Sequence, residues 1–292
     1  MMQISGKIKL PKGKKIAVNI GVDFDAQSAW MGGFGLFSPA YLSRGEFGAE
    51  VGAPRLLKLL DQYNIKTTWC IPGHTVDTYT DICKEIVEKG HEIVHHGYAH
   101  ENIANLNYEE EERVMQMGLE ALARIGVKPR GYRSPAWDFS PNTLELLEKY
   151  EFKYDSSLMG NDFYPYRPRP VQVNMDKANV FGLPSKVVEL PVSWFLDDFP
   201  QMEHVAGKLE GMRPVEDMFN RWKSIFDYAC ANEEEACLIV TIHPQTSGRA
   251  HIIMMLEQFI KYIDSQGAWI TTLGNIYDAY EEKTADLELS FK

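Results

Sequence analysis

Apolar, β-rich runs alternate with amphipathic helical patterns along nearly the whole chain of 292 residues. Runs such as 16–22 and 236–242 have the length and β-branched content of buried strands. Between such runs, apolar residues recur at helical spacing over 108–125, and Asn107 is placed to cap that helix. Strict alternation of this kind requires parallel strands joined by helical crossovers. The remaining strands are expected at 66–71, 91–95, 130–133, 152–156, 187–194 and 269–273.

These strands predict an α/β fold, a distorted TIM-like (β/α) barrel of about seven to eight parallel strands. Barrels of this class commonly reach the length of this chain as one domain, so we expect a single domain over 1–292 with its barrel over about 16–280. No GxGxxG or P-loop motif favours a doubly wound nucleotide-binding sheet instead. The segment 160–186 is rich in proline and aromatic residues, interrupts the alternation, and is expected to be an inserted loop.

The charge of the chain limits its partners. Thirty Lys and Arg residues against 41 Asp and Glu residues leave a formal net charge of −11, which disfavours nucleic acid and anionic membranes. No apolar run approaches the roughly 20 residues of a membrane-spanning helix. The N-terminal lysines precede no apolar stretch, so we expect no signal peptide and a cytoplasmic protein. Its separated cysteines are expected to be free thiols: Cys70, Cys83, Cys230 and Cys237.

Two carboxylates follow the first strand, at Asp23 and Asp25. Residues two apart in a strand point to the same side, and the carboxyl ends of barrel strands form the active face. Two anions so close repel each other unless a cation or a proton lies between them. A solvated loop pair is the ordinary explanation of an isolated DxD sequence, so this pair predicts a site only together with other residues.

Two histidines four residues apart, His96 and His100, follow the third strand. On one helical turn both imidazoles would reach a single point. One aspartate and two histidines suit a catalytic divalent metal with open positions for water, most simply Zn²⁺, although Fe, Co and Ni fit the same donors. A histidine-rich surface turn is the alternative explanation. His95 has no partner at that spacing and is expected either to support the metal ligands or to be structural.

Three more strand ends carry polar side chains. A buried Arg133 beside a carboxylate would keep that acid ionised and orient it. His243 leaves the strand 236–242 where it would protonate a leaving group. Trp137 offers a flat apolar wall for a ring, and Asp155 lies near the fifth strand. Each of these residues also has an ordinary explanation, as a surface arginine, a structural histidine, a core tryptophan or a loop acid.

Taken in order, five motifs resemble those of the polysaccharide deacetylases, the proteins with NodB homology in carbohydrate esterase family 4. The motifs are GVDFD, HGYAH, RSPAW, YDSS and TIHP, and the resemblance runs over about 16–280. The resemblance implies a distorted barrel that hydrolyses a non-peptide carbon–nitrogen bond with a divalent metal. It also implies roles for single residues: metal ligands Asp25, His96 and His100, a general base Asp23 oriented by Arg133, and a general acid His243 supported by Asp155.

Departures from the family pattern leave the substrate open. The paired acids are separated by Phe24, and the YDSS motif lacks the usual tryptophan. These features resemble the branch with peptidoglycan-deacetylase-like proteins, cyclic imide hydrolases and allantoinases. The expected function is removal of acetyl from an N-acetyl sugar, and the alternative is ring opening of a small cyclic imide or ureide. A catalytically inactive binding barrel is a third, less favoured hypothesis.

Aromatic residues are the expected contacts for either substrate, whether a glycan or a small molecule. They are Trp30, Trp137 and Tyr166, the last from a segment that would roof the site. Apolar residues on the loop 30–37 also indicate a surface that needs covering, which favours a homo-oligomer.

Overall fold

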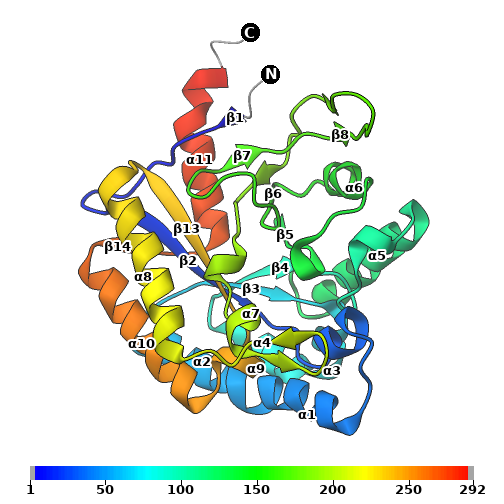
Figure 1. The fold of residues 1–292 in the computed structure, drawn as a ribbon, viewed down its shortest axis with the longest axis vertical. Coiled ribbons are helices and arrows are strands. Elements are labelled where there is room, and N and C mark those ends of the chain that lie inside the picture. Colours follow the sequence, from blue (N-terminus) through cyan, green and yellow to red (C-terminus); the bar gives the residue numbers. More distant parts are fainter. Residues whose placement is uncertain (1–3, 289–292) are drawn as a thin grey trace.

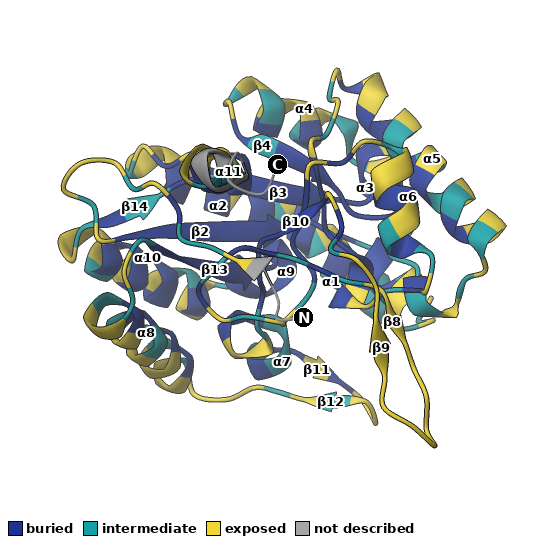
Figure 2. Cartoon of the chain, turned by 90° about the horizontal axis from the view of Figure 1, so that it is seen from above, coloured by how far each residue is buried: buried dark blue, intermediate teal, exposed yellow. Residues whose placement is uncertain are grey.

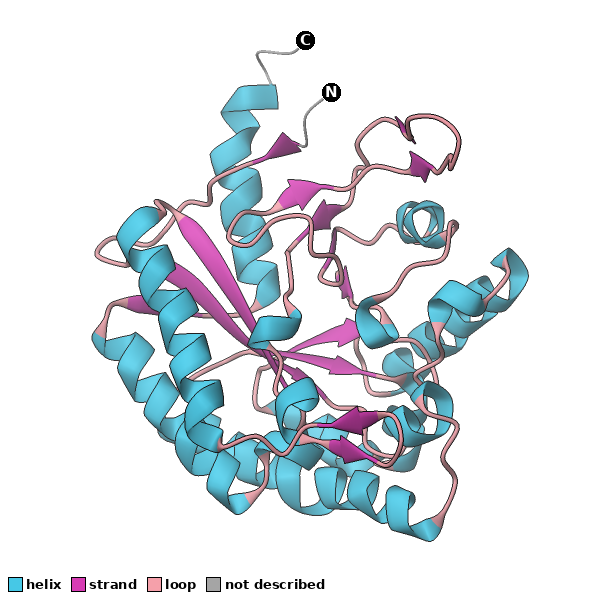
Figure 3. Ribbon diagram, in the orientation of Figure 1, coloured by secondary structure: helices cyan, strands magenta, loops and turns pink. Residues whose placement is uncertain are grey.

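A single curled sheet of ten strands forms the centre of the protein (Figures 1 and 3). The computed structural model describes residues 4–288. The strand order is β1-β7-β10-β6-β5-β4-β3-β2-β13, and β14 also pairs with β2. The strands are β1 (Ile4–Ser5), β2 (Ile16–Asp23), β3 (Thr68–Ile71), β4 (Glu92–His95), β5 (Gly131–Tyr132), β6 (Tyr154–Asp155), β7 (Tyr166–Arg167), β10 (Val188–Glu189), β13 (Ala236–Ile242) and β14 (Ala268–Ile270).

The pairings from β10 through β13, and that of β14 with β2, are all parallel. This confirms the expected α/β class and a barrel-like parallel sheet. The barrel is incomplete, because within the described residues no ladder joins β13 to β10. A single bridge between Asp197 and Thr241 spans that seam, together with a 2.9 Å hydrogen bond from Cys237 N to Phe163 O. Two short antiparallel strands, β7 and β1, extend the opposite edge.

Helices cover the outer face of the sheet (Figure 1). The expected cap is present: the Asn107 side chain accepts from Glu110 N at 3.0 Å and the Glu110 carboxylate accepts from Asn107 N at 3.0 Å. The helices are α1 (Pro39–Phe47), α2 (Ala53–Gln62), α3 (Gly73–Thr78), α4 (Thr80–Glu88), α5 (Tyr108–Arg124), α6 (Thr143–Lys149), α7 (Phe199–Met202), α8 (Val215–Asn232), α9 (Pro244–Ser247), α10 (Ala250–Ser265) and α11 (Leu273–Glu288). No helix among the described residues is both long and apolar enough to cross a bilayer.

The two long strands, β2 and β13, are buried over their full length (Figure 2). Parallel strands covered on both faces read as near-continuous apolar runs, which is why the sequence located them so well. Leu56, Trp222 and Phe259 pack from the helices into the main core against this sheet. The acids buried where β2 ends require partners, because a buried charge without a partner is costly, and these partners define the site.

The segment predicted as an inserted loop at 160–186 has two parts. Its first part contributes β7 to the edge of the main sheet, with Tyr166 buried. Its second part is a hairpin of β8 (Val171–Gln172) and β9 (Val180–Phe181), which extends away from the body (Figure 2). Apolar side chains on this hairpin are exposed, with Met175 at 92%. The oligomeric state stays a prediction.

Candidate active site

The carboxyl ends of the parallel strands bring the charged motif residues together. Asp23 and Asp25 come from the end of β2, His96 follows β4, Arg133 follows β5 and His243 follows β13. A cavity of about 170 Å³ opens among them. Its walls include four aromatic rings, which belong to Phe34, Trp137, Trp194 and Phe199. The site therefore combines charged side chains with apolar walls, as small-molecule pockets commonly do.

Asp25, His96 and His100 form a cluster whose ligand atoms all lie within 4.8 Å of one another. His96 Nε2 is 3.4 Å from Asp25 Oδ1, and His100 Nε2 is 3.8 Å from Asp25 Oδ2. The other nitrogen of His96, Nδ1, lies 2.7 Å from the carbonyl oxygen of Arg133. Donation of the Nδ1 hydrogen to this carbonyl leaves the Nε2 lone pair directed at the cluster.

Two atoms of this cluster, Asp25 Oδ1 and His96 Nε2, are enclosed by protein and have no hydrogen-bond partner among the described residues. Buried polar atoms without partners are costly, and a divalent cation would satisfy both. A carboxylate with two neutral imidazoles is also a donor set that Zn²⁺, Fe²⁺, Co²⁺ and Ni²⁺ accept. These residues therefore fit a divalent metal ion.

The spacing of the two histidines predicted a helical turn, and that prediction is wrong. Residues 96–100 form a loop in which His100 has a positive φ of 61°. The Glu101 carboxylate accepts hydrogen bonds from Tyr98 N at 3.1 Å and Ala99 N at 2.9 Å, which stabilises the loop. The loop packs so closely on Gly32 that a Cβ at that glycine would lie 1.9 Å from Ala99 O. Contact between two loops, rather than helical periodicity, brings His100 to Asp25.

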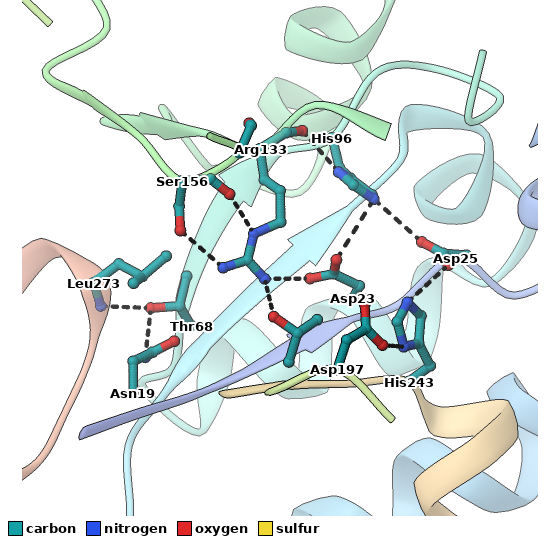
Figure 4. A network of polar contacts seen from close by, with 12 residues as sticks. Asn19, Asp23, Asp25, Thr68, His96, Arg133, Ser156, Asp197, His243 and Leu273 are labelled. Atoms are coloured by element: carbon teal, nitrogen blue, oxygen red, sulfur yellow. Dashed lines mark hydrogen bonds and ion pairs between the residues drawn. The ribbon is translucent and has the colours of Figure 1, made fainter. Parts of the chain in front are cut away.

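Arg133 holds the carboxylate of Asp23 (Figure 4). Its Nη1 donates to Asp23 Oδ1 at 2.7 Å, and its Nε donates to Ser156 O at 2.9 Å. Burial opposes ionisation of Asp23, but Arg133, His96 and His243 outweigh this effect and lower the pKa of the carboxyl to about 2. Gly21 leaves room for the guanidinium, since a Cβ there would be 3.2 Å from Arg133 Nη1. Asp23 is therefore an ionised and oriented carboxylate.

His243 pairs with Asp198, and the expected support from Asp155 is not found. His243 Nδ1 is 2.7 Å from Asp198 Oδ1, while Asp198 Oδ2 accepts from His243 N at 3.0 Å and from Ser247 Oγ at 2.5 Å. Burial opposes the charge of His243, but Asp198 and Asp197 outweigh it and hold the pKa of the imidazole well above its usual value. His243 Nε2 lies 3.7 Å from Asp25 Oδ2, so the charged imidazole faces the metal cluster.

Asp155 instead forms a buried acid pair with Glu189 on the neighbouring strand β10. The Asp155 side chain accepts from Ser157 Oγ at 2.7 Å, and Glu189 Oε1 accepts from Ser157 N and Leu158 N, both at 2.9 Å. Burial, together with Asp155, raises the pKa of the Glu189 carboxyl well above its usual value. The pair therefore shares one proton, and it supports the strand ends rather than the imidazole.

Replacing Glu189 with glutamine is expected to flatten the pH dependence of stability. The folded pKa of Glu189 is raised, so its contribution to stability is full below its unfolded value, about 4.3, and is lost as the pH rises. The amide keeps an acceptor for the two backbone N–H groups and adds a donor toward Asp155. Between about pH 5 and about pH 9, wild-type Tm should therefore fall by about 2–4 °C more than that of Glu189→Gln. Circular dichroism melts measure this, with exposed Glu145→Gln as the control; parallel curves for Glu189→Gln and the wild type would contradict the shared proton.

The predicted substrate contacts divide into one residue in the cavity and two outside it. Trp137 lines the cavity and stacks on Trp194 with ring centroids 4.3 Å apart. Trp30 is fully buried behind Phe34, which presents its own ring to the cavity. Tyr166 lies in β7, where its hydroxyl accepts from Gly160 N, and it does not line the cavity. The segment 160–186, from which a roof was predicted, contributes no residue to the lining of this cavity, and the walls come from other loops.

Sequence reasoning missed four residues around the cavity. Asp197 and Asp198 are adjacent acids between β10 and α7, and the rule for acids two apart at a strand end does not apply to them. The aromatic residues Trp194 and Phe199 gave no such signal, because isolated aromatic residues in loops are common, whereas Phe34 lies in the loop 30–37 that the sequence had singled out. Phe34 and Phe199 stack with centroids 5.8 Å apart, although 165 positions separate them in the chain.

Sequence comparison identifies proteins related to this chain. The family model described as polysaccharide deacetylase matches residues 46–154. A peptidoglycan deacetylase from Helicobacter pylori is 38% identical over 275 residues, which cover 88% of this chain and 94% of that protein. The peptidoglycan deacetylase-like protein FGM2 from Gibberella zeae is 31% identical over 306 residues, which cover 96% of this chain and 89% of that protein.

Solved structures share the same fold. A Mycobacterium smegmatis protein assigned to the polysaccharide deacetylases superposes with a TM-score of 0.84 at 30% identity, covering 97% of this chain and 96% of that one. The crystal structure of Puue allantoinase superposes with a TM-score of 0.78 at 22% identity, covering 94% and 92% of the two chains. The second likeness concerns the fold alone.

Proposed function

Because the chain belongs to the polysaccharide deacetylase family, we propose that it is a metal-dependent hydrolase that removes the acetyl group from an N-acetyl sugar. One observation carries this proposal. The cluster of Asp25, His96 and His100 lies between an ionised carboxylate and a charged imidazole in one cavity. Asp23 Oδ2 is 4.0 Å from His96 Nε2 on one side, and His243 Nε2 is 3.7 Å from Asp25 Oδ2 on the other.

Asp23 is the proposed general base. A divalent cation held by Asp25, His96 and His100 would supply Lewis acidity, lowering the pKa of a water molecule and polarising the amide carbonyl. Asp23 takes a proton from the attacking water, and Arg133 keeps the carboxylate ionised and oriented until then. Because Arg133 is itself held by Ser156, the base cannot turn away from the cavity.

His243 is the proposed general acid. Asp198 holds Nδ1, so the Nε2 hydrogen points toward the cavity and is available to the departing nitrogen. Water adds to the carbonyl carbon, the carbon–nitrogen bond breaks, and the nitrogen leaves with the proton from His243. The products are acetate and a free amine. Asp198 stabilises the imidazolium before this transfer, as a carboxylate does for a catalytic histidine elsewhere.

The size of the cavity favours a second candidate function, ring opening of a small cyclic imide or ureide. About 170 Å³ between two stacked aromatic pairs suits one small ring better than a long polymer. The same base, acid and metal ligands would serve this reaction, except that both products of the cleavage stay in one molecule. The two functions therefore differ in the substrate and not in the catalytic residues.

A substrate panel distinguishes the functions. Enzyme reconstituted with Zn²⁺, or with Fe²⁺, Co²⁺ or Ni²⁺ in parallel, is offered N-acetylglucosamine oligomers, succinimide, hydantoin and allantoin. We expect release of acetate from the oligomers, abolished by chelation and restored by metal. Ring opening without acetate release would support the second function instead. Inactivity toward the whole panel with every metal would contradict both and favour a binding barrel.

A further inference from the structure

Asp197 is a buried carboxyl in the reaction cavity that the proposed mechanism does not use. It lies in the segment between β10 and α7, and only 2% of its surface is exposed. Its backbone forms the single bridge to Thr241 that closes the seam of the barrel. Its side chain lines the same cavity as Asp23, Asp25 and His243 (Figure 4). The bridge holds this carboxyl at a defined place beside the proposed base and acid.

The other roles at this site are already filled by better-placed groups. The proposed ligand cluster consists of Asp25, His96 and His100, whereas Asp197 belongs to a second group with Asp198 and His243, in which Asp198 and His243 already pair with each other. The ion pair of His243 is made by Asp198 at 2.7 Å, whereas Asp197 Oδ1 lies 3.7 Å from the same nitrogen. Asp197 is therefore neither a member of the metal cluster nor the hydrogen-bond partner of the imidazole.

The two oxygens of Asp197 differ in their surroundings. Oδ1 accepts a hydrogen bond from Phe199 N at 2.7 Å, which sets the orientation of the carboxyl. For Oδ2 there is no hydrogen-bond donor in the part of the chain that the structure describes. Polar atoms that lack a partner and are fully enclosed by protein do not include Oδ2. It therefore keeps some exposed surface, and the side chain lines the cavity. An oriented group with one satisfied and one open oxygen is suited to contact a ligand.

The charge state of Asp197 suits a neutral ligand. Burial raises the pKa of the Asp197 carboxyl to about 8; His243 opposes this shift, and Asp198 and Asp23 add to it. A carboxyl with a raised pKa takes up a proton more readily than an ordinary aspartate, and in that form it donates a hydrogen bond as well as accepting one. An anionic group of a ligand at this point would instead meet the two other carboxylates that line the cavity, Asp23 and Asp25.

We propose that Asp197 is a substrate-contacting residue that forms a hydrogen bond with an oxygen of the uncharged ring in the cavity. On an N-acetyl sugar this oxygen is a ring hydroxyl beside the scissile acetamide. The assignment rests on the proposed function for the identity of the ring, and it assigns Asp197 to recognition rather than to proton transfer.

Two substitutions at Asp197 test the assignment in the metal-loaded enzyme. Asp197→Ala removes the hydrogen bond and is expected to raise KM about tenfold while kcat changes less than about threefold. Asp197→Asn has nearly the same volume and still donates a hydrogen bond, so its KM should stay within about threefold of the wild type. Melting temperature and bound metal, measured on both variants, show whether the fold and the metal site are intact.

Asp198→Asn is the matched comparison, because it changes the adjacent acid. This variant disturbs the partner of His243 and should lower kcat by about a hundredfold with little change in KM. If Asp197→Ala shows that same pattern, Asp197 acts through His243 and the assignment is overturned. The assignment is also overturned if Asp197→Asn raises KM as much as Asp197→Ala does, because the hydrogen bond would then not contribute to substrate binding.

Calorimetric binding separates this inference from the proposed function. N-acetylglucosamine oligomers are titrated into the Asp23→Asn variant with and without Asp197→Ala, so that no turnover occurs. An approximately tenfold weaker Kd with Asp197→Ala supports the contact, whether or not the wild type releases acetate. Absence of acetate release by the wild type would contradict the proposed function without contradicting the contact. Equal Kd values together with acetate release by the wild type would contradict the contact and leave the proposed function standing.

Discussion

Replacing Asp23 with asparagine is expected to lower kcat about a thousandfold, while the bound metal is retained. General base catalysis by a positioned side chain is commonly worth two to four orders of magnitude, about 10²–10⁴. Asparagine preserves the volume and an acceptor for Arg133 Nη1, so the buried guanidinium is not left without a partner. What is lost is the anionic oxygen that accepts the proton of water. Initial rates at saturating substrate measure the effect.

The control for this variant is Asp81→Asn, which makes the same chemical change on the exposed face of α4 and should leave kcat unchanged. Metal analysis accompanies the rates, because a variant that had also lost its metal would be slow for another reason. Full activity of Asp23→Asn with metal bound would falsify its assignment as the base. An unchanged kcat with an altered KM would point to substrate binding instead.

Replacing Asp25 with alanine is expected to remove the metal itself. Asp25 supplies the anionic oxygens of the cluster and lies within reach of both His96 and His100. Two neutral imidazoles alone offer neither the ligand number nor the charge that a catalytic divalent ion requires. Bound metal measured by mass spectrometry should fall from about one ion per chain to near zero, and activity should fall with it.

His251→Ala provides the comparison for Asp25→Ala, because His251 is exposed on α10 and far from the cluster in the sequence. That variant should keep its metal. Metal retention by Asp25→Ala would show that the ion binds elsewhere, with the Asp197, Asp198 and His243 group as the next set to examine. The Zn²⁺ assignment is tested in the same measurement, by competition among the four candidate ions.

Strands, helices and the order of the motifs could be predicted because their signals are local. The apolar runs of β2 and β13 and the cap at Asn107 are each recorded in a few neighbouring residues. The convergence of Asp23, His96, Arg133 and His243 follows from one rule, since parallel strands present their carboxyl ends on a common face. The resemblance of five ordered motifs then indicated the family.

Roles that depend on contact between distant loops could not be predicted. Asp155 was expected to support His243 from its place in a motif, yet Asp198 does so from a segment 45 positions before the histidine. The stacked walls Phe34–Phe199 and Trp137–Trp194 likewise join residues far apart in the chain. Short segments of sequence carry no signal for such contacts, because the contacts depend on how the loops pack at the carboxyl ends of the strands.

The sequence by itself determined the parallel α/β architecture and the set of acids, histidines and arginine at one end of the sheet, because periodicity and strand ends are properties of short segments. Only the tertiary structure decided which carboxylate holds His243, how His100 reaches Asp25 through a loop, and that Asp197 lines the cavity. The positions of Asp197 and Asp198 depend on the seam between β10 and β13, where a single bridge replaces a ladder, and the position of His100 depends on the packing of its loop against Gly32.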